Sequence, residues 1–358
     1  MTSRSFTNVD PLLEEDFDLV AIRNPQELQE ITNAHVVLTG ASGFVGKWLI
    51  GSWLSAKKFY GGPGRLLLTC RNPSELEAYF PGILNRTDIE VCGGDIRKFE
   101  IPSSFKPDYL IHGATSASDS LNRSNPREMI SVIIDGTRRA LDSAVQAGVK
   151  KFVFLSSGAV YGQHHPVGTL LKEDSLSGPS LHTPTSAYHE SKRLAELMCN
   201  IEAAQGTLAV VNLRLFTFLA PYLPMTTHFA AGNFIVSAMR NEPIVIKSGG
   251  GSVRSYMYGS DLASSIFLST QRNLSSSTYN VGSPSQVRID ELARQIRDIV
   301  NPKCTIEIQG IDTEENVTTY VPDTSLADSE LTFGVRLDLS RAIQKTISWL
   351  RIQCDIKG

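Results

Sequence analysis

The fold of this chain is decided by one glycine-rich stretch, Thr39-Gly40-Ala41-Ser42-Gly43-Phe44-Val45-Gly46. It lies between an apolar run at 35–39, which predicts a buried strand, and a helix expected from about 45 to 56. In such a turn the three glycines allow a tight bend, a close approach of the backbone to a pyrophosphate, and close packing of helix on sheet. The free N–H groups at the start of the helix then bind the anion. The strand–turn–helix context, more than the glycines alone, predicts a dinucleotide site. The residues expected to contact the dinucleotide here are Gly40, Ser42, Gly43, Phe44, Val45 and Gly46.

Short apolar strands and helices alternate along the first two thirds of the chain. Strands are expected at 35–39, 66–69, 89–92, 109–112, 151–156 and 210–215, and helices at 26–31, 45–56, 126–147 and 188–204. This alternation predicts a parallel sheet covered on both faces, in the doubly wound Rossmann arrangement of the α/β class. We expect an N-terminal arm at 1–33, whose short helix follows a capping residue at Asn24-Pro25, and a dinucleotide-binding domain at 34–222. A smaller mixed substrate lobe is expected at 223–358, with a segment at about 255–285 returning to the first domain.

Composition excludes several classes of protein. The chain has 358 residues, 34 basic and 37 acidic, and a net charge of -3, so no basic excess points to nucleic acid. No apolar run is long enough to cross a bilayer, and the acidic start is unlike a secretory signal. The five cysteines are odd in number and form no CxxC pair, which argues against a disulfide framework or a metal site and favours the cytoplasm.

The residues after the second strand address the type of cofactor. A carboxylate there would bind the ribose hydroxyls of NAD, whereas an arginine favours the additional phosphate of NADP. The strand ends with Thr69-Cys70-Arg71-Asn72, and the first acidic residue is Glu75. Arg71 therefore favours NADP(H) over NAD(H), with a solvated surface arginine as the alternative.

Tyr188 and Lys192 begin a predicted helix with i, i+4 spacing, which places the phenol and the ammonium on one face. A tyrosine has an ordinary pKa of ~10, and a nearby ammonium favours its phenolate, as acid–base chemistry at neutral pH requires. The lysine could also hydrogen-bond a nicotinamide ribose. The alternatives are a surface pair or a tyrosine packed in the core.

Ser156 and Ser157 follow the fifth strand, at the sheet edge where ligands bind, and a serine there could hold a substrate oxygen or only cap a turn.

Together these features resemble the extended short-chain dehydrogenase/reductase family, in its NAD-dependent epimerase/dehydratase group that acts on nucleotide sugars. The resemblance covers about residues 34–350. Its further motifs are Gly94-Asp95-Ile96, Val160-Tyr161-Gly162, Leu213-Arg214, Arg254-Ser255-Tyr256, Asp261-Leu262-Ala263 and Tyr279-Asn280-Val281-Gly282.

The resemblance implies roles for individual residues. Ser157, Tyr188 and Lys192 would be catalytic, the last two also contacting the cofactor. Asp95 and Ile96 would flank the adenine, and Ala114 would line the cofactor site. Arg254 would pair with the diphosphate of the substrate, and Asn233 would contact that diphosphate or the sugar. The alternatives are a surface arginine and a helix-capping asparagine.

One departure from the family pattern limits the reaction. The 4,6-dehydratases carry an Asp-Glu pair just after the catalytic hydroxyl residue, and the decarboxylases keep a glutamate there. This chain has Gly158 and Ala159, neither of which can carry a proton. The pattern therefore favours redox chemistry at one sugar carbon. Arg71 favours reduction of a 4-keto sugar nucleotide, with 4-epimerisation as the alternative and a non-catalytic dinucleotide sensor as a further class.

The resemblance also implies a homodimer, in which the helices at 126–147 and 188–204 pack against their symmetry mates. Leu194, Ala195, Leu197 and Met198 could serve that contact or face the sheet.

Overall fold

The computed structural model describes residues 10–115, 119–162, 168–175, 178–225, 229–313, 316–331 and 337–356. The chain divides into two compact units. Unit 1 comprises Met1–Ser156, Leu181–Leu213 and Ala263–Thr278, and unit 2 comprises Ser157–Ser180, Arg214–Leu262 and Tyr279–Gly358.

A seven-stranded sheet with the order β3-β2-β1-β4-β5-β6-β9 carries the expected doubly wound fold. The strands are β1 (Val36–Thr39), β2 (Leu66–Cys70), β3 (Ile89–Gly93), β4 (Tyr109–His112), β5 (Lys151–Ser157), β6 (Ala209–Leu215) and β9 (Thr278–Val281). From β3 to β5 the pairing is parallel, with Val36 opposite Leu66 on one side and Tyr109 on the other. The strand order reverses between β1 and β4, which is where ligands bind in such sheets. The α/β Rossmann class expected from the alternation is therefore confirmed.

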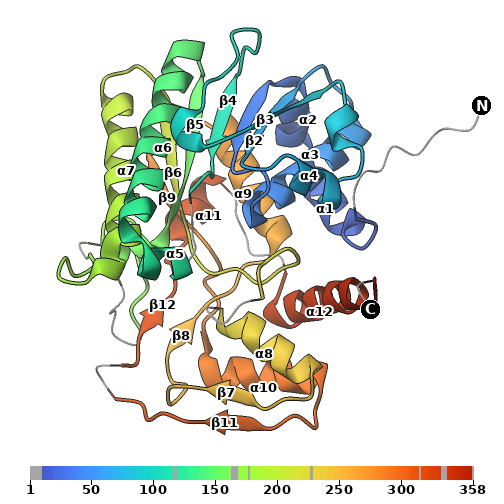
Figure 1. The fold of residues 1–358 in the computed structure, drawn as a ribbon, viewed down its shortest axis with the longest axis vertical. Coiled ribbons are helices and arrows are strands. Elements are labelled where there is room, and N and C mark those ends of the chain that lie inside the picture. The colour runs from blue at the N-terminus through green and yellow to red at the C-terminus, as the bar shows by residue number, and fades with distance from the viewer. Residues whose placement is uncertain are drawn as a thin grey trace, which may run out of the picture. The chain divides into compact units, whose positions relative to one another are not determined.

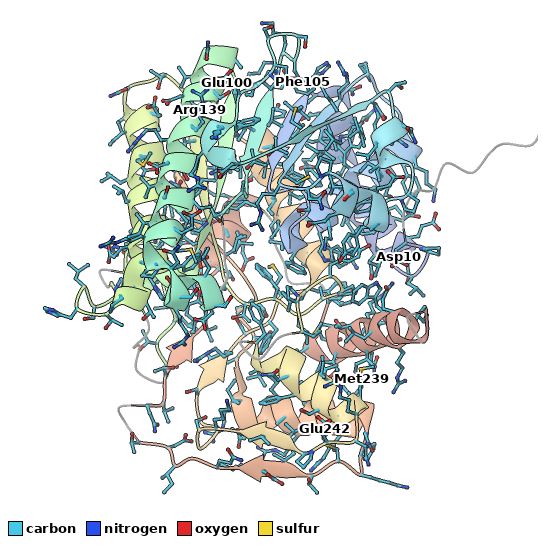
Figure 2. All side chains as sticks on the ribbon, viewed as in Figure 1. Asp10, Glu100, Phe105, Arg139, Met239 and Glu242 are labelled. Carbon is cyan, nitrogen blue, oxygen red and sulfur yellow. The ribbon has the colours of Figure 1, made fainter. Side chains whose placement is uncertain are left out.

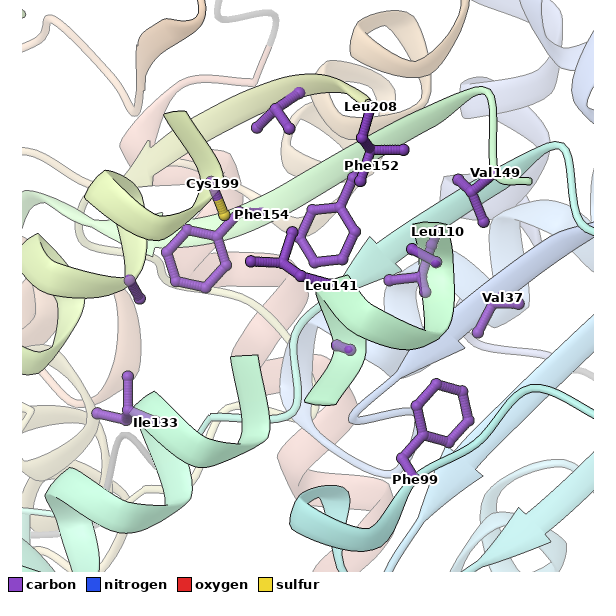
Figure 3. Close-up of a cluster of buried hydrophobic side chains, with 14 of the residues drawn as sticks. Val37, Phe99, Leu110, Ile133, Leu141, Val149, Phe152, Phe154, Cys199 and Leu208 are labelled. Atoms are coloured by element: carbon purple, nitrogen blue, oxygen red, sulfur yellow. The ribbon is translucent and has the colours of Figure 1, made fainter. Parts of the chain in front are cut away.

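Helices α6 (Pro126–Ala147) and α7 (Ala187–Ala204) lie side by side on one face of the sheet (Figure 1). The Asn125 side chain accepts a hydrogen bond from Glu128 N, and Gly148 ends α6 in the left-handed conformation, so local signals fix both ends of this helix. Under α6 and α7 lies a buried cluster that includes Leu110, Leu141, Phe152, Phe154 and Cys199 (Figure 3). At the surface, the Arg139 side chain of α6 forms an ion pair with Glu100 (Figure 2).

The N-terminal segment forms two helices, α1 (Glu14–Arg23) and α2 (Pro25–Asn33), both against α3 (Phe44–Tyr60). The Phe17 ring packs edge-on against Trp48, with centroids 5.1 Å apart, and occupies the space left by the missing side chain of Gly51. The sequence indicated α2 but not α1. Asn24 occupies the N-cap position of α2, as expected, but its side chain makes no capping bond. Its amide donates to Val20 O and to Ser264 Oγ instead.

The remaining elements of the first half connect the sheet strands. They are α4 (Ser74–Tyr79), η1 (Ile83–Asn85), η2 (Ile96–Lys98), α5 (Asp119–Ser124), η3 (Gly158–Tyr161) and η4 (Pro184–Ser186). Helix α9 (Gly259–Gln271) follows later in the chain. Within the described residues, no helix combines the length and apolarity needed to cross a membrane.

Unit 2 contains two small sheets and three longer helices. One sheet has the order β10-β8-β12, from β8 (Val253–Arg254), β10 (Val287–Arg288) and β12 (Thr319–Tyr320). The other pairs β7 (Ile244–Ile246) with β11 (Ile306–Ile308). The core between α8 (Ala230–Met239), α10 (Ile289–Val300) and α12 (Leu339–Ile356) includes Ile235, Leu292, Ile296 and Ile343, and α11 (Ser325–Leu331) precedes α12.

Candidate active site

The glycine turn after β1 is shaped by close backbone approaches. Gly40 has a φ of +76°, and a Cβ at this position would lie 2.6 Å from Gly113 O. A Cβ on Gly46 would lie 2.6 Å from Gly40 O. Both approaches exclude side chains, so these glycines hold the turn against β4 and against the start of α3.

Gly43 stands at the N-cap of α3 and makes no side-chain capping bond. Among the described residues outside its own helical turn, Gly40 O at 3.1 Å is the one atom recorded within 4 Å of a Cβ built on Gly43. A cradle of backbone at the start of a helix, with little protein in front of it, suits a pyrophosphate. The predicted residues Ser42, Phe44, Val45 and Gly46 are part of the same turn and first helical residues.

The residues expected near the adenosine lie at the ends of β2 and β3. Arg71 directly follows β2 and is exposed. The Asp95 carboxylate accepts hydrogen bonds from Arg97 N at 2.9 Å and Arg97 Nε at 3.0 Å, and these bonds lower the pKa of Asp95 to about 2. Arg97 in turn contacts Glu128 of α6. The Ile96 side chain packs over Gly136 of α6, where a Cβ would lie 2.8 Å from Ile96 Cγ2.

A buried chain of hydroxyl and imidazole groups joins β1, β4 and α6. Thr39 Oγ1 accepts hydrogen bonds from Gly113 N and Ala114 N, both at 3.2 Å, and lies 2.8 Å from His112 Nδ1. Because the threonine oxygen accepts from both amides, its own proton points to Nδ1, and His112 Nε2 then donates to Thr137 Oγ1 at 3.2 Å. Burial, aided by the charge of Lys192, lowers the pKa of His112 to about 3, so the ring is neutral. This chain fixes the backbone at Ala114.

Lys192 is the most completely buried of the predicted site residues, with 1% of its surface exposed. Its ammonium donates to Thr115 Oγ1 at 2.8 Å and to Leu155 O at 2.6 Å. It lies 6.0 Å from the centre of the Tyr188 ring. Burial lowers the pKa of Lys192 to about 7, and the Glu196 carboxylate partly opposes that shift. Among the described residues two of its three N–H groups thus have acceptors, which leaves one direction for a ribose or for the phenol.

The start of α7 is positioned from α5. Asn122 accepts a hydrogen bond from Tyr188 N at 3.2 Å and donates to Thr185 O at 2.7 Å. Tyr188 itself is partly buried against the core of unit 1. The structure therefore brings together the tyrosine–lysine pair that the i, i+4 spacing predicted.

The two serines at the end of β5 have different partners. Ser156 donates to the buried carboxylate of Glu196 at 2.5 Å. Ser157 is the first residue of unit 2, and its Oγ accepts from Ala159 N at 3.1 Å. This bond caps η3, as the alternative interpretation proposed, but it uses only an acceptor position, so the Ser157 hydroxyl proton can still be donated to a ligand.

The predicted substrate residues Arg254 and Asn233 lie in unit 2. The Arg254 guanidinium donates to Val253 O at 2.8 Å, to Thr318 O at 3.0 Å and to Thr318 Oγ1 at 3.2 Å, and burial lowers its pKa. Asn233 lies in the first turn of α8, where Phe229 is the N-cap, so the interpretation of Asn233 as a helix cap is wrong.

Sequence reasoning missed three contributors to the site: Thr115, Glu196 and the neutral His112. Glu196 is four residues beyond Lys192 on the same helix, a spacing that could have identified it. Thr115 is 77 residues from Lys192 in the chain, and no local sequence pattern predicts its hydrogen bond to the ammonium.

Comparisons with known proteins identify the family and the fold. The model of the NAD dependent epimerase/dehydratase family matches residues 36–282. The chain is 24% identical over 323 residues to UDP-glucuronic acid decarboxylase 1 of Arabidopsis thaliana, covering 88% of this chain and 69% of that protein.

Two solved structures illustrate the similarity of fold. One is UDP-glucose 4-epimerase from Thermotoga maritima with UDP-glucose, at a TM-score of 0.75 and 18% identity over 89% of this chain and 99% of that chain. The other is dTDP-glucose 4,6-dehydratase from Bacillus anthracis in complex with NAD, at a TM-score of 0.72 and 16% identity over 90% and 98% of the two chains.

Replacing Thr115 by Val tests how the ammonium of Lys192 is held. The hydroxyl stabilises the charged form, so its loss should lower the pKa of Lys192 from about 7 by roughly one unit, the size expected for a hydrogen bond to a charged group. An NMR titration of protein labelled at lysine Cε reports that pKa directly. Thr115→Ser should restore it, and Thr270→Val, which removes a buried hydroxyl bonded within its own helix, should leave it unchanged. An unaltered titration in Thr115→Val contradicts the assignment.

Proposed function

The chain belongs to the NAD dependent epimerase/dehydratase family, and we propose that it transfers a hydride between a nicotinamide dinucleotide and one carbon of a nucleotide sugar. The observation that carries this proposal is the buried ammonium of Lys192, held by Thr115 and Leu155 beside Tyr188. A phenol next to a fixed positive charge is suited to exchange a proton with a sugar oxygen at neutral pH.

Each catalytic residue has one task in this mechanism. Tyr188 gives its phenolic proton to the carbonyl oxygen of a keto sugar, or takes a proton from the corresponding alcohol in the reverse direction. Lys192 stabilises the phenolate through its charge, and Ser157 donates a hydrogen bond that steadies the same sugar oxygen. When bound, the nicotinamide cofactor supplies or accepts the hydride.

The residues that follow Ser157 argue against a reaction that eliminates water from the sugar. Gly158 and Ala159 cannot remove a proton from carbon, and the space that a side chain at position 158 would need is occupied by Tyr320 and Phe216. We therefore propose redox chemistry at a single carbon, with reduction of a 4-keto sugar nucleotide as the net reaction and no dehydratase or decarboxylase step.

4-Epimerisation is the second candidate, because it needs the same three residues. The exposed Arg71 favours NADP(H), and net reductases consume NADPH, whereas an epimerase retains and recycles NAD. A sensor protein that binds a dinucleotide without turnover is the least supported class, since Tyr188 and Lys192 are both in place.

The proposed substrate has a diphosphate for Arg254 and Asn233 to contact. The relatives named above carry UDP-linked or dTDP-linked sugars in their names, and we propose a nucleoside diphosphate hexose of this kind. The guanidinium of Arg254 is fixed on the backbone of β8 and next to β12, which suits a planar donor for a diphosphate.

We further propose a homodimer through α6 and α7. Apolar side chains are exposed on both helices: Ile130 is 45% exposed, Leu194 46%, Leu197 55% and Ile201 45%. Leu194, Leu197 and Ile201 repeat at helical spacing on α7 and form one apolar stripe, which a second copy of the chain would cover. Ala195 faces the core instead, being fully buried.

Exchange of Tyr188 for Phe tests the mechanism. Loss of the proton donor should lower kcat by about 10²–10⁴-fold while the affinity for the cofactor stays within about twofold. NADPH consumption with a 4-keto sugar nucleotide measures the first and calorimetry the second. Undiminished turnover in this variant contradicts the proposed role.

Exchange of Arg71 for Asp tests the cofactor preference. If Arg71 binds the 2′-phosphate, the KM for NADPH should rise at least about tenfold, because a charge-assisted bond is lost, while use of NADH changes little. Arg138→Asp changes the same charge at an exposed site on α6 and serves as control. Equal use of both cofactors by the natural chain, or bound NAD and no net NADPH consumption, favours the epimerase.

Exchange of Leu197 for Glu tests the dimer. A charge in the middle of the stripe should halve the molecular mass measured by light scattering at equal concentration. Ile22→Glu, at an equally exposed apolar residue of α1, should leave the mass unchanged. A natural chain that is already a monomer refutes the dimer.

A further inference from the structure

Gly158, immediately after Ser157, is covered by a side chain from far along the sequence. A Cβ built on Gly158 would lie 2.5 Å from the hydroxyl oxygen of Tyr320 and 2.9 Å from Phe216 Cζ. Both distances are shorter than a real Cβ tolerates, so the volume of a side chain at 158 is already filled. The atom that lies nearest to this Cβ position is the phenol hydroxyl oxygen of Tyr320.

The phenol is held in place by its own unit. The rings of Tyr320 and Phe216 are 4.8 Å apart with an interplanar angle of 36°. Phe216 is buried, and its amide donates to Val281 O. Tyr320 keeps part of its surface exposed while packing on this cluster. The ring packing therefore gives the hydroxyl a defined position next to Gly158.

Tyr320 also stands beside the residue proposed to hold the diphosphate. In the parallel pair of β12 with β8, Tyr320 is the register partner of Arg254. Register partners project to the same face of a sheet, so the phenol and the guanidinium share a face. In the other direction, the chain geometry places the phenol oxygen within about 8 Å of the Ser157 Cα.

A phenol in this place has a definite chemical capacity. A neutral tyrosine hydroxyl both donates and accepts hydrogen bonds, as sugar hydroxyls do. A group of this kind distinguishes substrates by a hydrogen bond that an analogue without the partner hydroxyl cannot make.

We propose that Tyr320 is a substrate-specificity residue, whose hydroxyl takes the place of a side chain at position 158 and hydrogen-bonds a hydroxyl group of the sugar near the reacting carbon. This inference rests on the proposed nucleotide-sugar substrate. It assigns to the hexose a contact separate from those of Ser157 and Tyr188, which hold the reacting oxygen.

The proposal is tested by comparing the Tyr320→Phe variant with the natural chain, both as full chains. Calorimetry measures the affinity of each for UDP-glucose, for its 3-deoxy and 6-deoxy analogues, and for UDP. The variant should bind UDP-glucose about tenfold more weakly and UDP as the natural chain does, because the hydroxyl contacts the sugar alone. The natural chain should bind one of the two deoxy analogues about tenfold more weakly than UDP-glucose. The variant should bind that analogue and UDP-glucose equally, since removing either hydroxyl removes the same hydrogen bond.

Two matched variants separate this contact from packing. Tyr279→Phe removes another phenol hydroxyl of the same unit, bonded to Glu330 at 2.5 Å, and should leave every affinity unchanged. Gly158→Ala keeps Tyr320 but forces its hydroxyl aside, and should reproduce the loss for UDP-glucose.

The outcomes are distinguishable. The role of Tyr320 is overturned if Tyr320→Phe binds UDP-glucose as tightly as the natural chain does and discriminates equally against both deoxy analogues. That result leaves the proposed function intact. A natural chain that binds neither UDP-glucose nor dTDP-glucose and turns over no sugar nucleotide overturns the proposed function, and this inference with it.

Discussion

The buried ammonium of Lys192 is the constraint around which the rest of the site is arranged. A charge with 1% exposure is tolerated only when its N–H groups find acceptors, and here they come from two segments, Thr115 in the loop after β4 and Leu155 in β5. The helix that carries the lysine is held at its start by Asn122. Glu196, one turn further along, balances the charge and binds Ser156. The carboxyl edge of the sheet is thus a single polar assembly inside an apolar core.

This assembly supports the proposed exchange of a proton between Tyr188 and one sugar oxygen. Desolvation brings the pKa of the lysine down to about 7, so the ammonium is poised where a small change in its surroundings alters its charge. The neutral His112 nearby adds no second positive charge, because burial holds it unprotonated between two threonines. The field at the Tyr188 phenol therefore depends on Lys192, Glu196 and the groups that bind them.

The identity of the residue after Ser157, the serine proposed to be catalytic, limits the proposed chemistry in a different way. A glycine at position 158 removes the proton-transferring side chain, and the fold then fills the space with the phenol of Tyr320. Position 158 carries no carboxylate, and Tyr320, 162 residues later in the chain, places a phenol hydroxyl in the space that a side chain there would need. Overall similarity to a decarboxylase or to an epimerase would not reveal this exchange, because it concerns two residues.

The sequence by itself determined strands β1 to β6, the helices α2, α3, α6 and α7, the glycine turn and the tyrosine–lysine pair. These features follow from periodicity and from spacings of a few residues, which the local backbone converts directly into shared faces and tight turns. It missed α1 and the partner of the Asn24 amide, because the ring of Phe17 and that amide contact residues that are distant in the chain. Only the tertiary structure decided that Thr115 holds Lys192, that His112 is neutral and that Tyr320 covers Gly158. Desolvation and close packing arise when remote segments exclude water together, and no local pattern of residues encodes which segments meet.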